Sequence, residues 1–348
     1  MRNALGLMLG VVVMASLLAG GRFAVGWFRS DLAIARSVAD QEASPQPAAA
    51  SDGLAAKDDV EVTGAIPAKP ASPSMATPAP VPRQAVCANP DALGVSRVVE
   101  VDTAGGPGFG FEHFKQFDFL TDKEVVLTFD DGPWPNNTPA VLKALDDECT
   151  KAVFFSIGKH ATYHPEILRQ VLAAGHTVGT HTWSHANLNG KKMTEQMAKD
   201  EIEKGISAVK WALGTEPSPF FRFPELQHSP AMVTYLGTRN VAMFSCDLDS
   251  FDYRKDSTPE KVVNSVMTKL NKRGKGIILM HDFQKHTAEA LPMLLRQLKA
   301  GGYKIVQMKA KTSVQTLPEY DAEFVNEMKL PTAGARPVST VVQTVSSR

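Results

Sequence analysis

Two histidines and a pair of adjacent carboxylates are the clearest chemical signal in this 348-residue sequence. His181 and His185 are four residues apart, so on one helical turn both side chains face the same way and can bind one metal ion. Asp130 and Asp131 follow a β-rich run, where two unpaired carboxylates are costly to desolvate. Each pattern is weak alone, because Asp-Asp-Gly-Pro is common turn chemistry and a single histidine is usually a core or surface residue. Together they have the composition of a catalytic metal site.

The residue types suggest which ion would bind and what it would do. Asp131, His181 and His185 form a set of two histidines and one carboxylate, which favours one zinc ion. Cobalt, nickel, iron or manganese can occupy the same ligands. A divalent ion held there polarises a carbonyl and lowers the pKa of its bound water.

Three further polar residues supply acid–base chemistry. Asp130 is free to act as the general base, and Arg222 can orient it and keep it ionised through a charge-assisted hydrogen bond. His281 follows an apolar run and can protonate a leaving amine. One base and one acid beside a polarised carbonyl describe amide or ester hydrolysis through an oxyanion.

These residues follow strands in a chain that alternates strands with helices. Because such alternation indicates a parallel sheet, the strand ends and their polar residues meet at one edge. We therefore predict an α/β fold, a closed or nearly closed (β/α) barrel of about seven parallel strands. The predicted strands are 124–129, 151–157, 176–180, 220–223, 241–245, 276–280 and 303–308, and the predicted helices are 138–147, 165–174, 194–213, 230–237, 259–270 and 287–300.

Over about residues 119–308 the sequence resembles the polysaccharide deacetylases, the NodB-homology group of carbohydrate esterase family 4. The family's five motifs can be placed in order at residues 128–133 (TFDDGP), 181–185 (HTWSH), 222–224 (RFP), 249–253 (DSFDY) and 279–281 (LMH). The first two match closely. Glu225 stands where the family usually has an aromatic residue, and Cys246 and Tyr253 stand where it often has tryptophan.

The resemblance implies a distorted (β/α) barrel of the glycoside hydrolase/deacetylase type and a role for each matched residue. Asp130 is the expected base, His281 the acid, Asp252 the residue that tunes the acid, and Arg222 the residue that holds the base. Asp131, His181 and His185 are the expected metal ligands, and Glu225, Leu279 and Tyr253 are expected to contact substrate. The three departures put the substrate groove in question rather than the metal site.

The ends of the chain differ in composition from its middle. Residues 1–28 are largely apolar after one arginine and indicate a signal peptide or a membrane anchor. Residues 29–86 indicate an Ala/Pro-rich disordered tether, 87–118 an N-terminal extension packing on the barrel, 119–310 the catalytic domain, and 311–348 a C-terminal tail. We expect an exported protein, periplasmic or extracellular, whose membrane contact is limited to the N-terminal segment.

Charge and cysteine content bound the partners. The 37 basic and 37 acidic residues cancel, which argues against nucleic acid as a partner. Export permits disulfides, and we expect Cys87 to pair with Cys149 and tie the extension to the barrel. Cys246 would remain an unpaired, buried residue. We expect a monomer.

The predicted function is metal-dependent removal of acetyl groups from a glycan that contains N-acetylglucosamine, such as chitooligosaccharide or peptidoglycan. One alternative is an O-deacetylase similar to acetyl xylan esterases. Another is a non-catalytic glycan-binding envelope protein, which would bind glycan but release no acetate. An envelope scaffold would keep its phenotype after Asp130→Asn.

Overall fold

The computed structural model describes residues 87, 89–115 and 117–329. The predicted signal or anchor (1–28) and the predicted tether (29–86) lie outside the described residues, as do residues 330–348. Among the helices of the described part, none combines the length and the apolar character that a membrane span requires.

The described residues form a ten-stranded sheet in which every pairing is parallel. The main path runs β1-β10-β3-β4-β5-β6-β7-β2, and β3 also pairs with β9, which pairs with β8. The strands are β1 Arg97–Val101, β2 Gly108–Phe109, β3 Glu124–Asp130, β4 Val153–Ser156, β5 Thr177–Thr180, β6 Phe220–Arg222, β7 Ala242–Phe244, β8 Leu248–Asp249, β9 Gly276–His281 and β10 Lys304–Ala310.

The sheet curls into a distorted barrel. From β7 the pairings run through β6, β5, β4, β3 and β9 to β8, yet β7 and β8 are separated by only residues 245–247. The two ends of this path, β7 and β8, must therefore lie close together. No pairing joins β7 to β8 in the described residues, and β2 pairs with the free edge of β7. This confirms the predicted barrel of parallel strands.

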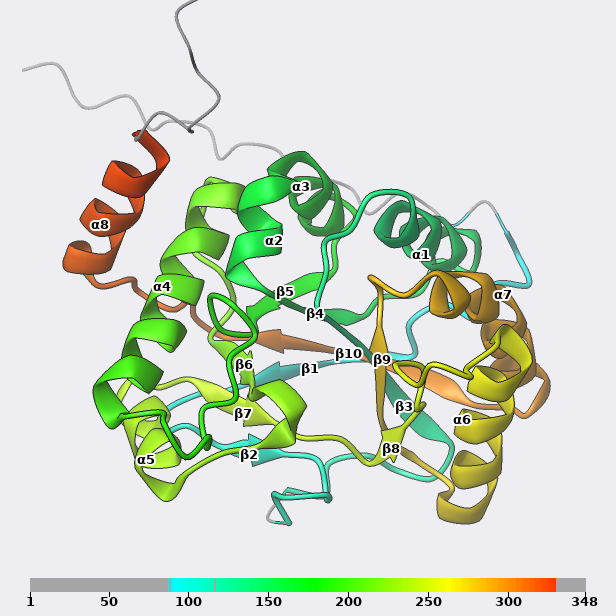
Figure 1. Ribbon diagram of the computed structural model, residues 1–348. Helices are drawn as coiled ribbons and strands as arrows, with labels where there is room; N and C mark the ends of the chain where they lie inside the picture. The colour runs from blue at the N-terminus through cyan, green and yellow to red at the C-terminus, as the bar shows by residue number, and fades with distance from the viewer. Residues whose placement is uncertain (1–86, 88, 116, 330–348) are drawn as a thin grey trace, which may run out of the picture. The chain divides into compact units, whose positions relative to one another are not determined.

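Helices surround the strands (Figure 1). They are α1 Asn137–Asp147, α2 Gly158–Tyr163, α3 Pro165–Ala173, α4 Glu195–Leu213, α5 Pro230–Thr238, α6 Pro259–Arg273, α7 Lys285–Ala300 and α8 Pro318–Lys329, with a 3₁₀ turn at Pro224–Leu226. Each strand and helix predicted from the sequence is present, with bounds that differ by a few residues. The elements β1, β2, β8, α2 and α8 were not predicted.

Alternation along β3 decides which side chains face the barrel interior. Val125 and Leu127 belong to the cluster shared with the outer helices, whereas Val126 belongs to the interior cluster with Phe155 and Phe244. Since successive strand residues face opposite sides, Thr128 and Asp130 share the interior face with Val126. A hydrophobic strand thus delivers one carboxylate into the barrel at its carboxyl end.

The segment before β3 is attached to the barrel at several points. β1 adds to the free edge of β10, and Cys87 forms a disulfide with Cys149, which directly follows the C-cap of α1. Near this disulfide, Glu148 accepts hydrogen bonds from the backbone N–H of Leu93 (2.8 Å) and from the ammonium group of Lys299.

The predicted C-terminal tail (311–348) is wrong for part of its length, because residues 318–329 form α8. This helix packs on α4. Phe324, 1% exposed, contacts the rings of Trp183 and Trp211 with centroids 5.9 and 5.6 Å apart. A single anchoring aromatic side chain leaves little periodic signal in the sequence, which is why the helix was missed.

Loss of the disulfide should destabilise the domain. It closes a loop between cysteines 62 residues apart, so we expect Cys87→Ser/Cys149→Ser to lower the free energy of unfolding by about 2–5 kcal/mol. Urea denaturation of the oxidised wild type and the double variant measures this difference. Equal transition midpoints would contradict it, and reductant should shift the wild type but not the variant.

Candidate metal and catalytic site

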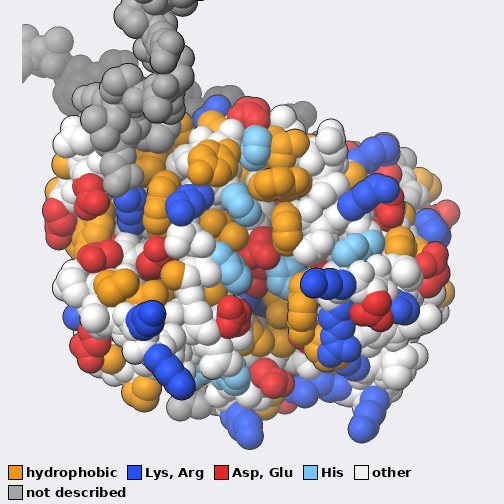
Figure 2. Space-filling model, in the orientation of Figure 1, with side chains coloured by type: hydrophobic (Ala, Val, Ile, Leu, Met, Phe, Trp, Pro, Cys, Tyr) orange, Lys and Arg blue, Asp and Glu red, His pale blue; other side chains and the backbone are white. Residues whose placement is uncertain are grey.

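The predicted site residues meet at the carboxyl ends of the strands. Most of them line a cavity of about 320 Å³, and histidine and acidic side chains gather near the middle of this face (Figure 2). The lining residues are Asp130, Asp131, His181, His185, Phe223, Glu225, Leu226, Asp249, Tyr253, Leu279 and His281. Every residue predicted as base, acid, metal ligand or substrate contact is among them.

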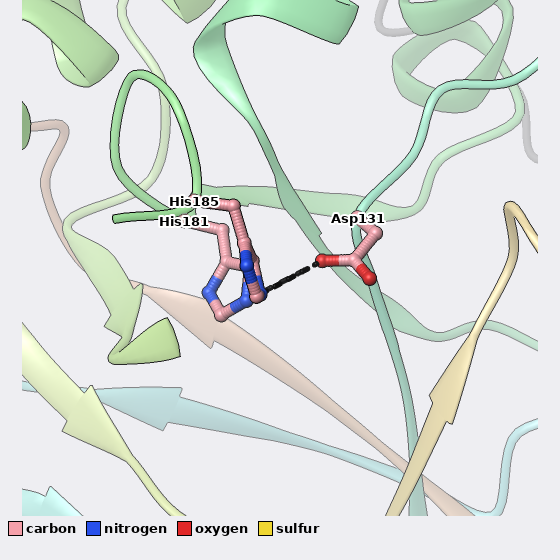
Figure 3. Close-up of side chains that lie close together, drawn as sticks. All are labelled: Asp131, His181 and His185. Atoms are coloured by element: carbon pink, nitrogen blue, oxygen red, sulfur yellow. Dashed lines mark ion pairs between the residues drawn. The ribbon is translucent and has the colours of Figure 1, made fainter. Parts of the chain in front are cut away.

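The three predicted metal ligands point toward one another (Figure 3). Asp131 Oδ1 lies 3.5 Å from His181 Nε2 and 3.5 Å from His185 Nε2. The His181 Nδ1 hydrogen bonds to the carbonyl oxygen of Arg222 at 2.7 Å. This bond assigns the proton to Nδ1 and leaves the Nε2 lone pair directed at Asp131.

The chemistry of these donors fits a divalent cation. The ligand atoms of Asp131, His181 and His185 all lie within 4.8 Å of one another. Asp131 Oδ1 is buried and has no hydrogen-bond partner in the described part of the chain, which is costly for a carboxylate oxygen. Burial also lowers the pKa of His181 well below its usual value, so this imidazole is neutral, as a metal ligand must be.

The loops around the cavity use left-handed backbone conformations. Positive φ angles occur at Asp131 (74°), Thr182 (62°), His185 (62°) and Glu225 (55°). Such values are uncommon for residues other than glycine and are retained where the surrounding structure enforces them. Their concentration at the strand ends is typical of a functional site.

A buried ion pair fixes the predicted base. Arg222, 0% exposed, donates from Nη1 to Asp130 Oδ1 (2.7 Å) and to Thr128 Oγ1 (2.8 Å), and from Nη2 to the Ser245 carbonyl (2.9 Å). Burial raises the pKa of Asp130 to about 6, although Arg222 and His281 act in the opposite direction. Arg222 therefore favours the ionised form of Asp130, but burial is the larger influence on its pKa.

A second buried pair holds the predicted acid. The His281 Nδ1 hydrogen bonds to Asp252 Oδ1 (2.6 Å), and the His281 backbone N–H donates to Asp252 Oδ2 (2.7 Å). Burial disfavours the imidazolium, but Asp252 outweighs it and raises the pKa of His281 to about 10. Burial likewise disfavours the Asp252 carboxylate, yet its bonds to His281 and Thr287 leave the pKa of Asp252 below its usual value.

Several supporting residues were not predicted. Thr287 donates to Asp252 Oδ2 at 2.6 Å, and Asp282 accepts from the backbone N–H of Gly132 at 3.1 Å. A Cβ at Gly132 would lie 2.1 Å from Asp282 Oδ2, so this turn requires glycine. Asp282 directly follows His281, and that adjacency was the available signal. Thr287 had no signal, since its partner lies 35 positions away.

The predicted substrate contacts differ in character. Tyr253 is 51% exposed, and its ring centroid lies 5.8 Å from that of His281. Leu279 is a buried apolar residue of the cavity wall, and Glu225 accepts a hydrogen bond from Asn187 at 2.7 Å. Cys246 is buried and does not line the cavity, and burial raises the pKa of its thiol to about 12.

The fold and the site together define a parallel α/β barrel with a candidate Asp-His-His metal centre beside the predicted base Asp130 and the predicted acid His281. The family model described as "Polysaccharide deacetylase" matches residues 119–242. A chitooligosaccharide deacetylase of Azorhizobium caulinodans is 33% identical over 162 residues, which are 45% of this chain and 73% of that protein. The chain belongs to the polysaccharide deacetylase family.

Two further relatives are peptidoglycan deacetylases. The peptidoglycan-N-acetylglucosamine deacetylase PgdA of Listeria monocytogenes is 33% identical over 186 residues, which are 53% of this chain and 38% of that protein. The chain thus spans well under half of that relative's length. A solved peptidoglycan deacetylase of Bdellovibrio bacteriovorus superposes with a TM-score of 0.55 at 34% identity, covering 62% of this chain and 59% of the other.

The Asp252–His281 pair should give stability a defined pH dependence. His281 has a folded pKa of about 10, above about 6.5 when unfolded. Its contribution is therefore fully present below the unfolded pKa and is lost as pH rises through the folded one. As pH rises between these two pKa values, loss of this contribution should lower the free energy of unfolding of the wild type by up to about 1.4 kcal/mol per pH unit.

We expect Asp252→Asn to remove this pH-dependent loss. Urea denaturation at several pH values between the two pKa values, with chelator present throughout, measures how the free energy of unfolding of each protein changes with pH. Asp256→Asn serves as the control, because Asp256 is an exposed carboxylate paired with Lys261. Parallel curves for wild type and Asp252→Asn would contradict the assignment.

Proposed function

We propose that this protein hydrolyses the acetamide group of N-acetylglucosamine units in a glycan. The observation that carries the proposal is the convergence of two separately held groups on one cavity. Asp130 is fixed by Arg222 and His281 by Asp252, and both line the cavity with the candidate metal ligands. Membership of the polysaccharide deacetylase family supports the same reaction.

Asp131, His181 and His185 would hold one divalent ion in this proposal. Zinc is the preferred ion for two imidazoles and one carboxylate, with cobalt, nickel, iron and manganese as alternatives. When bound, such an ion acts as a Lewis acid toward the amide oxygen and acidifies water.

The protein's own groups move the protons. Asp130 accepts a proton from the attacking water, whose oxygen forms the new bond to the acetyl carbon. His281, kept protonated by Asp252, donates a proton to the amide nitrogen as the carbon–nitrogen bond breaks. The products are acetate and a free amine on the sugar, and Arg222 keeps the Asp130 carboxylate in place throughout.

The remaining cavity residues supply contacts suited to a sugar. Leu279 offers an apolar wall for the acetyl methyl group, and the exposed ring of Tyr253 offers a flat surface for a pyranose ring. Glu225 presents a carboxylate at the rim, where it is joined to Asn187. This combination of apolar wall, aromatic face and polar rim is common in small-ligand sites.

Peptidoglycan and chitooligosaccharide are the proposed substrates. The names of the Listeria, Bdellovibrio and Azorhizobium relatives include both polymers. We further propose that residues 119–310 form the catalytic domain and that the protein is monomeric. Residues 1–28 would direct export to the periplasm or the cell exterior, as signal peptide or anchor, and 29–86 would form the tether.

Acetate release should depend on metal and on an N-acetylated glycan. We expect the full chain to release acetate from acetylated chitooligosaccharide or peptidoglycan, to stop after chelator treatment, and to recover when Zn²⁺ is restored. Enzymatic acetate determination with parallel amine labelling measures both products. Release from acetylated xylan alone would favour the O-deacetylase alternative, and glycan binding without acetate from any substrate would favour a non-catalytic protein.

Removal of the base should lower turnover sharply in the protein that remains folded, although loss of the carboxylate also leaves the buried charge of Arg222 uncompensated and destabilises the barrel. Asp130→Asn keeps the shape of the side chain and an oxygen acceptor for Arg222, but it cannot take a proton from water. We expect kcat to fall by about 10²–10⁴-fold, measured by acetate release. Asp256→Asn makes the same chemical change at an exposed position and should retain wild-type kcat. Equal activity of the two variants would exclude Asp130 as the base.

A further inference from the structure

The loop that carries both histidine ligands lies between β5 and α4 and has an unusual backbone. Thr182 and His185 both have φ angles of 62°, in the left-handed region. The His185 backbone N–H donates to Thr182 Oγ1 at 3.0 Å, which closes the loop on itself. Because such conformations persist only where neighbouring structure enforces them, the loop needs support from outside.

Glu201 of α4 supplies that support with three acceptor atoms. Its carboxylate accepts from the Ser184 backbone N–H (Oε2, 2.8 Å) and from Ser184 Oγ (Oε1, 2.7 Å). Its carbonyl oxygen accepts from the Trp183 backbone N–H at 2.8 Å. One helix residue thus holds two successive peptide groups between the histidines.

Close packing makes this contact possible. A Cβ at Gly205, one turn further along α4, would lie 2.6 Å from the backbone carbon of Thr182. On the other side, the backbone N–H groups of Gly158 and Lys159 in α2 donate to the carbonyls of Thr182 and Trp183, each at 2.9 Å. The loop is therefore held between α2 and α4.

The two histidines differ in how their rings are oriented. His181 is anchored by its own ring bond to the Arg222 carbonyl. The His185 ring makes no hydrogen bond within the described part of the chain; its Nε2 lies 3.5 Å from Asp131 Oδ1, and its side chain is 33% exposed. The His185 ring also packs edge-on against the His181 ring, with centroids 5.0 Å apart. Its direction therefore depends on these contacts and on the backbone that Glu201 fixes.

Helix α8 adds an outer layer to this support. The Trp183 ring, between the two histidines in sequence, contacts Phe324 of α8, with centroids 5.9 Å apart. The ammonium of Lys204 in α4 lies 4.9 Å from the centroid of the Trp183 ring. Residues beyond the predicted barrel thus pack against the ligand loop.

We propose that Glu201 is a positioning residue for the metal centre, setting the direction of His185 through Ser184. The proposal rests on the proposed function, since it assumes that His185 binds a metal ion. Hydrogen-bonded partners behind a ligand commonly change metal affinity by about 10–100-fold when removed. Here the partner acts through the backbone, because within residues 87, 89–115 and 117–329 the His185 ring has no hydrogen bond of its own.

Zn²⁺ titration calorimetry of the metal-stripped full chain tests this directly, at a temperature well below unfolding. We expect Glu201→Ala to weaken Zn²⁺ binding by about 10–100-fold and Ser184→Ala to weaken it less. Because both act through one contact, the double variant should be no weaker than Glu201→Ala. Glu195→Ala is the matched control, since Glu195 is an exposed carboxylate in the first turn of the same helix, and it should bind Zn²⁺ like wild type.

The outcomes separate this proposal from the proposed function. Unchanged Zn²⁺ affinity in folded Glu201→Ala would overturn the positioning role alone. A wild type that binds no divalent ion would overturn both. If Glu201→Ala does not fold, Glu201→Gln and Ser184→Ala decide the matter, since each weakens the contact while keeping most of the packing. A purely structural role would lower the melting temperature without changing Zn²⁺ affinity.

Discussion

The buried guanidinium of Arg222 is the interaction on which the site depends. This guanidinium donates hydrogen bonds to Asp130 and Thr128 on β3 and to the carbonyl of Ser245 after β7. The backbone carbonyl of Arg222 accepts a hydrogen bond from the His181 ring. A charge this deeply buried is tolerated because a carboxylate and two neutral oxygens surround it. Removing either partner of the Arg222–Asp130 pair would leave an uncompensated charge inside the barrel. The same two side chains therefore stabilise the fold and hold the proposed base in place.

Buried partners of opposite charge also distinguish the two proposed proton-transfer groups. Asp130 and His281 line one cavity, yet each has a different buried partner. Arg222 gives Asp130 a cationic neighbour, and Asp252 gives His281 an anionic one. The proposed base and acid can thus hold opposite protonation states at neutral pH, as hydrolysis of an amide requires.

Sequence reasoning predicted the barrel, the proposed base and acid and the candidate metal ligands from strand periodicity and from the polar residues at strand ends, which are local signals. The expected substrate contacts Glu225, Leu279 and Tyr253 came only from the family resemblance. Sequence reasoning did not predict β1, β2 and β8, of which the last two contain only two residues each, nor helix α8, which carries little periodic pattern. The supporting contacts were also missed. Glu201 and Thr287 lie on helices 17 and 35 positions from the residues they hold, and only the folded chain brings these pairs together.

Crystallography of the Zn²⁺-loaded full chain, with anomalous data collected at the zinc edge, tests the central claim most directly. The account predicts one anomalous peak at bonding distance, about 2.0–2.2 Å, from Asp131 Oδ1, His181 Nε2 and His185 Nε2, with Asp130 still paired to Arg222. A peak coordinated by other residues, or a zinc ion that displaces Asp130 from Arg222, would contradict it.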